Sequence, residues 1–117
     1  MVLIVEDNPD LREVMAVTLE SEGYDVVSAR DGREALDRLR GGDKPCLILL
    51  DLMMPVMNGW EFRDQQSHDP ALSDIPVVVV SAFTDLPNRG TDLRAAAYLR
   101  KPLHLSSLLE TVGRFCA

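Results

Sequence analysis

Short apolar runs alternate with helix-forming segments along this chain, and this alternation restricts the fold more than any other feature. Residues 2–5, with the sequence VLIV, form an unbroken apolar run of the kind found in strands buried on both faces. Similar runs cover residues 24–29, 46–51, 77–81 and 96–100. Strands that alternate with helices pair in parallel through right-handed crossovers. The sequence therefore predicts a doubly wound, three-layer α/β fold with a five-stranded parallel sheet.

The segments between these runs carry helix-start signals. Asn8 and Pro9 form an N-cap followed by a proline at the first helical position, where its missing N–H is no loss. Asp31 and Glu34 give a second start of the D-x-x-E type. Further helices are expected from Asn58-Gly59 onward, for about two turns, and over residues 105–115.

The segment between Ser81 and Ala95 gives the weakest helical signal. It contains Pro87 and Gly90 and lacks a regular apolar stripe. A short or irregular helix is expected there, which brings the expected number of helices to about five.

The size and charge of the chain limit the classes of protein to consider. A length of 117 residues suits one domain with a hydrophobic core, so we expect a single domain over residues 1–117 with no output domain. The abrupt start at Val2 slightly favours a domain trimmed from a longer protein. A net charge of −7 argues against nucleic-acid binding, because contacts to phosphate dominate that affinity.

Location and cysteine chemistry follow from equally simple features. The N-terminus has no basic region and reaches an acid at Glu6, so it does not resemble a signal peptide, and no aliphatic run is long enough to span a membrane. These features predict a cytoplasmic protein. Cys46 and Cys116 lie far apart and form no C-x-x-C motif, so free thiols are expected. His68 and His104 are assigned no role.

Polar side chains stand where the predicted strands end. Glu6 and Asp7 follow the first strand, Asp51 ends the third, Ser81 ends the fourth, and Lys101 follows the fifth. Because the carboxyl ends of parallel strands meet at one edge of a sheet, these side chains are expected to share a small patch.

Three carboxylates in one place repel one another unless a cation is present. A hard cation such as Mg²⁺ suits carboxylates, a backbone carbonyl and waters, without histidine or cysteine. With Mg²⁺ bound, Asp51 could attack a phosphorus atom while Lys101 and the Ser81 hydroxyl contact the remaining phosphoryl oxygens. This chemistry would explain why the most apolar run of the chain ends in a carboxylate.

Four motifs in order give the chain its resemblance to a known family. LIVEDN, LILLDLMMPVMNG, VVVVSA and YLRKP each fall at a predicted strand end. Over essentially its whole length the chain resembles the receiver domain of two-component response regulators. The resemblance implies a flavodoxin-like fold with strand order 2-1-3-4-5 and a function in phosphorelay signal transduction.

The resemblance also implies roles for single residues. Asp51 would be the phosphoacceptor. Asp7 and Asp51 would bind Mg²⁺, for which Mn²⁺ could substitute, together with the backbone carbonyl of Met53, while Glu6 would act mainly through coordinated water. Lys101 would pair with the phosphoryl group, and the Lys101–Pro102 bond would be cis, which X-Pro bonds adopt at low cost.

A switch and a set of partners follow from the same resemblance. Ser81 would be the hydroxyl that moves toward the phosphoryl group, and Tyr98 the aromatic side chain that swings inward on activation. The donor would be a phosphohistidine on a sensor kinase or phosphotransfer protein, and the output would act on a downstream protein. A monomer or weak dimer is expected, with no membrane contact.

The sequence departs from the family in two places. Arg94-Ala95 stands where members usually have Gly-Ala, and the segment from Ser81 to Lys101 is about two residues short. Both changes fall on the helix expected between Ser81 and Ala95, part of the face that receiver domains commonly use for dimerisation or output. They therefore argue against a dimer through that face. Met53 and Phe83 occupy the variable positions beside the phosphoryl site, and their bulk predicts slow self-dephosphorylation.

The same residues also admit other interpretations. Asp51 could be a turn acid, Glu6-Asp7 could favour a helix N-terminus, and Ser81 and Tyr98 could be ordinary strand residues. A Mg²⁺-dependent aspartyl-phosphate phosphatase would require a general acid at the position of Met53 and a cap that encloses its substrate, and no loop here is long enough for a cap. A receiver-like module that only binds partners would be expected to lack an acid, the hydroxyl or the lysine. A self-phosphorylating and self-dephosphorylating switch, without turnover of an external substrate, fits the residues best.

Overall fold

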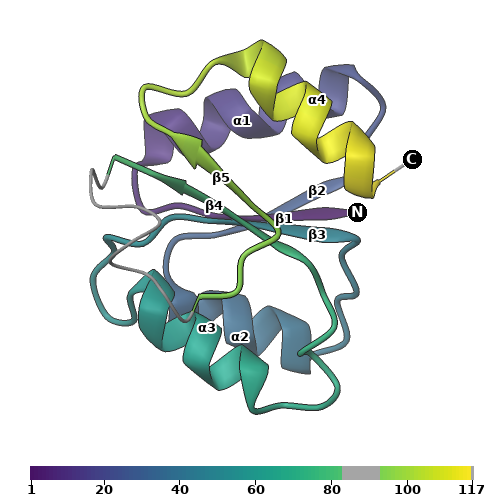
Figure 1. Cartoon of the computed structure of the whole chain (residues 1–117). Helices are drawn as coiled ribbons and strands as arrows, with labels where there is room; N and C mark the ends of the chain where they lie inside the picture. Colours follow the sequence, from purple (N-terminus) through teal and green to yellow (C-terminus); the bar gives the residue numbers. More distant parts are fainter. Residues whose placement is uncertain (83–92, 117) are drawn as a thin grey trace.

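The computed structural model describes residues 1–82 and 93–116 of the chain, which fold into alternating strands and helices (Figure 1). The elements are β1 (Val2–Val5), α1 (Pro9–Ser21), β2 (Val26–Ala29), α2 (Gly32–Arg40), β3 (Leu47–Leu50), α3 (Gly59–Ser67), β4 (Val77–Ser81), β5 (Ala97–Arg100) and α4 (Leu105–Phe115). All five predicted strands are confirmed. The second begins at Val26 because the preceding Tyr24 donates its backbone N–H to Leu19 at the end of α1.

The five strands form one parallel sheet in the order β2-β1-β3-β4-β5. Helices α1 and α4 cover one face, and α2 and α3 cover the other (Figure 1). The predicted three-layer, doubly wound fold and strand order are confirmed. Four helices lie in the described residues, and the further helix expected between Ser81 and Ala95 falls mainly on residues 83–92, outside them. No helix of the described segments is long and apolar enough to cross a membrane.

The core has two halves because side chains alternate between the faces of each strand. Strands β1, β3 and β4 are buried throughout. Every second residue of these strands packs under α2 and α3, and the residues in between pack under α1 and α4. This burial on both faces explains why the runs are uninterrupted rather than alternating. It also makes the sheet a rigid support for the loops that leave its carboxyl edge.

Helix caps fix the loops that leave the carboxyl ends of the strands. The Asn8 side chain accepts hydrogen bonds from the backbone N–H groups of Asp10 and Leu11 and so starts α1 directly after β1. Asn58 and Glu61 form a reciprocal capping box at the start of α3. The loops after β1 and β3 are therefore short and anchored at both ends.

The two cysteines correct one sequence-based prediction. Free thiols were expected, but Cys46 and Cys116 form a disulfide whose Cα atoms lie 5.6 Å apart across a sequence separation of 70 residues. Cys46 directly precedes β3, and Cys116 directly follows α4. The packing of α4 on the sheet returns the end of this helix to the start of β3, a proximity that sequence spacing does not reveal.

Candidate functional site

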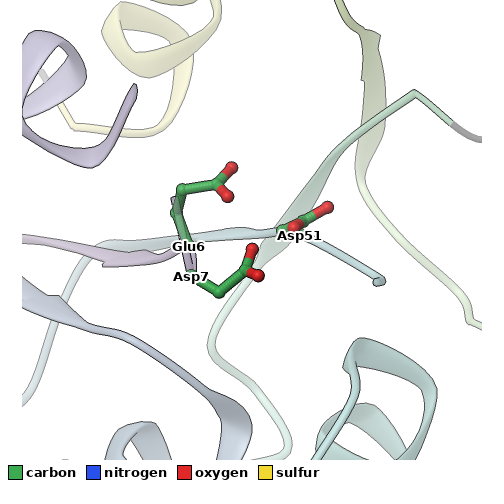
Figure 2. Close-up of side chains that lie close together, drawn as sticks. All are labelled: Glu6, Asp7 and Asp51. Atoms are coloured by element: carbon green, nitrogen blue, oxygen red, sulfur yellow. The ribbon is translucent and has the colours of Figure 1, made fainter. Parts of the chain in front are cut away.

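Three carboxylates meet at the carboxyl ends of β1 and β3, as the sequence predicts. Glu6, Asp7 and Asp51 each offer an oxygen within 4.8 Å of the others (Figure 2). The register of the sheet causes this meeting: Val5 pairs with Leu50, and the N–H of Asp51 donates to the carbonyl of Val5 over 2.9 Å. Residues that come directly after these paired strands must therefore lie side by side.

The three acids differ in their exposure. Glu6 and Asp51 are only 1% and 4% exposed, whereas Asp7 is exposed. Glu6 is held in place because its Oε2 accepts the N–H of Asn8 over 3.1 Å and its carbonyl accepts from Arg12 Nη1 over 2.8 Å. The cluster thus has a buried wall and one open side, at Asp7.

Lys101 brings a cation to the same cluster. Its Nζ lies 2.8 Å from Glu6 Oε1 and 3.6 Å from Asp51 Oδ1. Its backbone N–H donates to the carbonyl of Ser81 over 3.0 Å, and the Lys101–Pro102 peptide bond is cis, as the family resemblance implies. Ser81 is fully buried at the end of β4. The structure therefore brings five predicted site residues to one edge of the sheet.

Burial and like charges change the protonation of Asp51. Removal from water is the main cause that raises the pKa of Asp51 from 3.8 to about 7, and the charges of Glu6 and Asp7 add to the effect. Lys101 and a hydrogen bond from the backbone of Met53 oppose the rise without cancelling it. In the absence of a metal, this carboxyl group therefore keeps its proton to a higher pH than a free aspartate does.

The surroundings of Lys101 favour its charged form, in contrast to those of Asp51. Burial alone would lower the pKa of Lys101, but its hydrogen bond to Glu6 and the charge of Asp51 raise that pKa above its usual value. The ammonium group therefore stays charged across the physiological range. One half-buried cation faces two buried carboxylates and the exposed Asp7, so the site as a whole keeps an excess of negative charge.

The donor set suits a hard divalent cation. All three acidic residues offer carboxylate oxygens within 4.8 Å of one another, and the described residues of this cluster include no histidine or cysteine. Oxygen-only ligation is typical of Mg²⁺, which also keeps waters and accepts backbone carbonyls. Burial, and after it the charges of Glu6 and Asp7, raise the pKa of Asp51, and a bound cation would favour its ionised form. Met53, whose carbonyl is the further expected ligand, lies two residues beyond Asp51 and is 60% exposed.

Gly59 supports the site in a way that sequence reasoning missed. Its N–H donates to the carbonyl of Leu52 over 3.0 Å, and a Cβ atom at this position would lie only 2.5 Å from the carbonyl oxygen of Asp51. The start of α3 therefore packs directly on the backbone of the acid. The sequence marks the Asn58-Gly59 pair only as a helix start, although a glycine eight residues after Asp51 is the available signal.

Tyr98 and the two histidines, which were assigned no role, lie away from the carboxylates. Tyr98 is half-buried on β5, pairs with Val79 and packs against the core under α2 and α3. His68 pairs with Asp64 on the surface of α3, and His104 precedes α4, so neither reaches the cluster. Phe83, expected beside the phosphoryl site, lies outside the described residues.

Comparison with known proteins identifies the family. The sequence model of the response regulator receiver domain matches residues 2–113, so the chain belongs to this family. It is a receiver domain, the class of domain that works in two-component phosphorelay signalling. Receiver domains interact with histidine kinases and downstream targets, and the relatives are signalling regulators.

Three proteins of known class are similar to the chain over most of its length. Response regulator MprA of Mycolicibacterium vanbaalenii is 39% identical over 92% of this chain and 46% of its own length. The polar-differentiation response regulator DivK of Brucella anthropi is 34% identical over 97% of this chain and 94% of its own length. The structure of response regulator TrrA of Thermotoga maritima, in complex with Mg(2+)-BeF, is 27% identical with a TM-score of 0.86 and covers 97% of this chain and 96% of that chain. The chain thus spans less than half the length of several curated relatives, but nearly all of DivK.

Proposed function

We propose that Asp51 accepts a phosphoryl group from a phosphohistidine donor in a Mg²⁺-dependent reaction. The observation that carries this proposal is a buried carboxylate, 4% exposed, with two further carboxylates and the Lys101 ammonium around it. Such a group of side chains lowers the stability of the fold, because one ammonium does not compensate the burial and mutual repulsion of the carboxylates, and groups perturbed in this way are typical of functional sites.

The metal would be held by Asp7 and Asp51 directly, by the backbone carbonyl of Met53, and by Glu6 mainly through water. Mg²⁺ is the proposed ion, and Mn²⁺ has the same preference for oxygen ligands. When bound, the ion supplies positive charge that neutralises the oxygens of the transferring phosphoryl group. Asp7, on the open side of the cluster, would guide the ion to the two buried acids.

The side chains have separate tasks in the transfer. A carboxylate oxygen of Asp51 attacks the phosphorus, the P–N bond to the donor imidazole breaks, and the imidazole leaves with the bonding electron pair and takes up a proton. Lys101 then binds a phosphoryl oxygen, since its ammonium lies only 3.6 Å from Asp51. The Ser81 hydroxyl binds another. The apolar strand behind Asp51 keeps the nucleophile in place throughout.

The conformational change on phosphorylation is proposed to begin at Ser81 and to reach Tyr98. Phosphorylation adds charge at one edge of the sheet, and a movement of Ser81 and Tyr98 would convert it into a changed protein-interaction surface. The partners would be a sensor kinase or histidine phosphotransfer protein and a downstream protein, with the domain acting as a monomer or weak dimer. Because phosphohistidine is formed from ATP, donor and acceptor are proposed to meet in the cytoplasm.

Two other functions have less support. A phosphatase with an aspartyl-phosphate intermediate would want a general acid near Asp51, but Met53 at the corresponding place has no proton to give. A module that only binds partners would not need the intact set of acids, hydroxyl and lysine. We therefore propose a switch that does not turn over an external substrate.

The deciding experiment is intact mass after incubation with acetyl phosphate and Mg²⁺. A gain of one phosphoryl group is expected for the native protein and for Asp64→Asn, a matched change at a carboxylate that is 72% exposed on α3. No gain is expected for Asp51→Asn or with a chelator. A gain that survives Asp51→Asn would exclude Asp51 as the acceptor, and no gain in the folded native protein would favour the partner-binding module.

A further inference from the structure

We propose that the Cys46–Cys116 disulfide is a redox modification site, which a dithiol reductant opens in the folded domain by thiol–disulfide exchange. The bond joins the start of β3 to the end of α4. Its opening would release the last turn of α4 while the fold persists. The proposal goes beyond the phosphoryl chemistry and requires nothing of Asp51.

The disulfide is accessible because it borders a cavity. Cys46 and Cys116 both line a cavity of about 630 Å³, together with Tyr24 and Phe115. Cys46 is only partly buried, whereas Cys116 is 7% exposed. A disulfide enclosed in a core reacts only after unfolding, but one beside a cavity can be attacked directly by an external thiolate. Cys46, as the more exposed of the two residues, offers the sulfur that meets the attacking group.

The bond restrains one end of one helix. Cys116 caps α4 and donates its N–H to the carbonyl of Val112 over 2.9 Å. Earlier residues of α4, Leu108 and Val112, are fully buried against the sheet and do not depend on the disulfide. Reduction should therefore loosen the last turn of α4 and leave the rest of the helix in place.

The redox site and the phosphoryl site lie at opposite ends of the sheet. Cys46 directly precedes β3 and donates its N–H to the carbonyl of Met1, just before β1, so the disulfide lies where these strands begin. The carboxylates lie where β1 and β3 end (Figure 2). The disulfide therefore touches none of the acids or Lys101. Its redox state can therefore change the end of α4 without changing the chemistry at Asp51.

The exchange balances as a two-electron transfer. A thiolate of the dithiol attacks Sγ of Cys46, the S–S bond breaks, and Cys116 leaves as a thiolate that takes up a proton. The second thiol of the reductant then attacks the mixed disulfide and releases Cys46 as a thiol. The products are two protein thiols and one oxidised dithiol. A cytoplasmic location, proposed above, supports exposure of this bond to dithiol reductants, because disulfides in reducing compartments are mainly transient or redox-sensing.

The first test is the rate at which dithiothreitol opens the bond, followed by thiol alkylation and intact mass. Direct attack predicts a rate that rises linearly with dithiothreitol and does not respond to urea below the unfolding transition. A route through global unfolding would accelerate steeply with urea, because unfolding exposes much surface. That result would overturn the proposal, as would alkylation of two thiols before any reductant is added.

The second test determines which part of the domain loosens when the disulfide is reduced. Reduction should lower the melting temperature by about 10 °C, since loss of a long-loop disulfide is substantial in a domain of this size. It should raise hydrogen exchange in the last turn of α4 more than in α2 and α3, where exchange should rise only as far as the lower global stability requires. The Cys46→Ser/Cys116→Ser variant should resemble the reduced protein with or without dithiothreitol. Asp51→Asn should keep the full redox response. An equal acceleration in α2, α3 and the last turn of α4, or no change in α4, would contradict local release.

Discussion

The Nζ atom of Lys101 lies 2.8 Å from Oε1 of Glu6, in an ion pair whose glutamate side chain is almost completely buried. The same ammonium is 3.6 Å from Asp51, so the lysine is paired more closely with the residue that is not the proposed nucleophile. A phosphoryl group on Asp51 would offer Lys101 a more highly charged partner. In the unphosphorylated domain, Glu6 therefore holds the lysine beside Asp51.

This pairing predicts that Glu6→Gln lowers the pKa of Asp51 below its native value of about 7. The substitution removes the charge that, after burial, raises this pKa most, and it frees Lys101 to pair with Asp51. Carboxyl ¹³C NMR titration of the metal-free protein measures the change. Glu110→Gln, at an exposed position on α4, is the control and should change nothing. An unchanged or higher pKa in Glu6→Gln would show that burial alone determines the titration of Asp51.

The raised pKa of Asp51 predicts that the metal-free domain loses stability as the pH rises. A group whose pKa is higher in the folded state stabilises the fold fully below its unfolded value, here 3.8, and this contribution is lost as the pH passes through about 7. Asp51→Asn should therefore stabilise the domain at pH 8 by about 2 kcal/mol or more, and by less at pH 5. Urea unfolding with a chelator measures both values. Asp64→Asn should retain the native pH dependence, and a less stable Asp51→Asn at pH 8 would contradict the prediction.

Proton competition predicts weaker metal binding in acid. Mg²⁺ requires the ionised form of Asp51, which has a pKa of about 7 without metal. The apparent Kd should therefore be about tenfold higher at pH 6 than at pH 8. Isothermal titration calorimetry at the two pH values, in two buffers of different ionisation enthalpy, also measures the proton released. Equal affinities without proton release would mean that the metal does not use Asp51.

Met53 predicts a long phosphoryl lifetime. Its side chain is 60% exposed two residues beyond Asp51, where it can obstruct water approaching the phosphorus. Met53→Ala should shorten the lifetime of the phosphorylated protein several-fold, as measured by intact mass after removal of acetyl phosphate. Val56→Ala, which truncates an apolar side chain that is 80% exposed in the same loop, should not. Equal lifetimes in all three proteins would count against steric protection by Met53, and an unchanged lifetime in Phe83→Ala would count against a role of Phe83.

The sequence was sufficient to predict which residues meet at the carboxyl ends of the strands. Once the apolar runs are interpreted as parallel strands, the meeting of Glu6, Asp7 and Asp51 results from the geometry of a parallel sheet. The position of Lys101 results in the same way from the fifth strand. These predictions succeeded because they depend only on local patterns and on one rule of topology.

Contacts between distant segments could not be predicted in this way. Gln66 is fully buried in α3, where its Nε2 donates to the carbonyls of Leu72 and Ile75, although a glutamine in a helix is usually exposed. The Cys46–Cys116 disulfide likewise depends on how α4 packs. Both features arise from tertiary packing, which leaves no periodic signal in the sequence.

The close approach of Gly59 to Asp51 predicts that Gly59→Ala damages both the fold and the site. The added Cβ would lie 2.5 Å from the carbonyl oxygen of Asp51 and 2.7 Å from Cδ2 of the buried Leu52, so the backbone must shift. We expect a loss of about 1–3 kcal/mol in urea unfolding and slower phosphorylation by acetyl phosphate. Gly113→Ala is the matched control, because the nearest atom to its added Cβ is Tyr24 Oη at 3.7 Å. Alanine within helix α4 should stabilise the domain by about 1 kcal/mol and leave phosphorylation unchanged. A native urea midpoint and phosphorylation rate in Gly59→Ala would show that the start of α3 does not position Asp51.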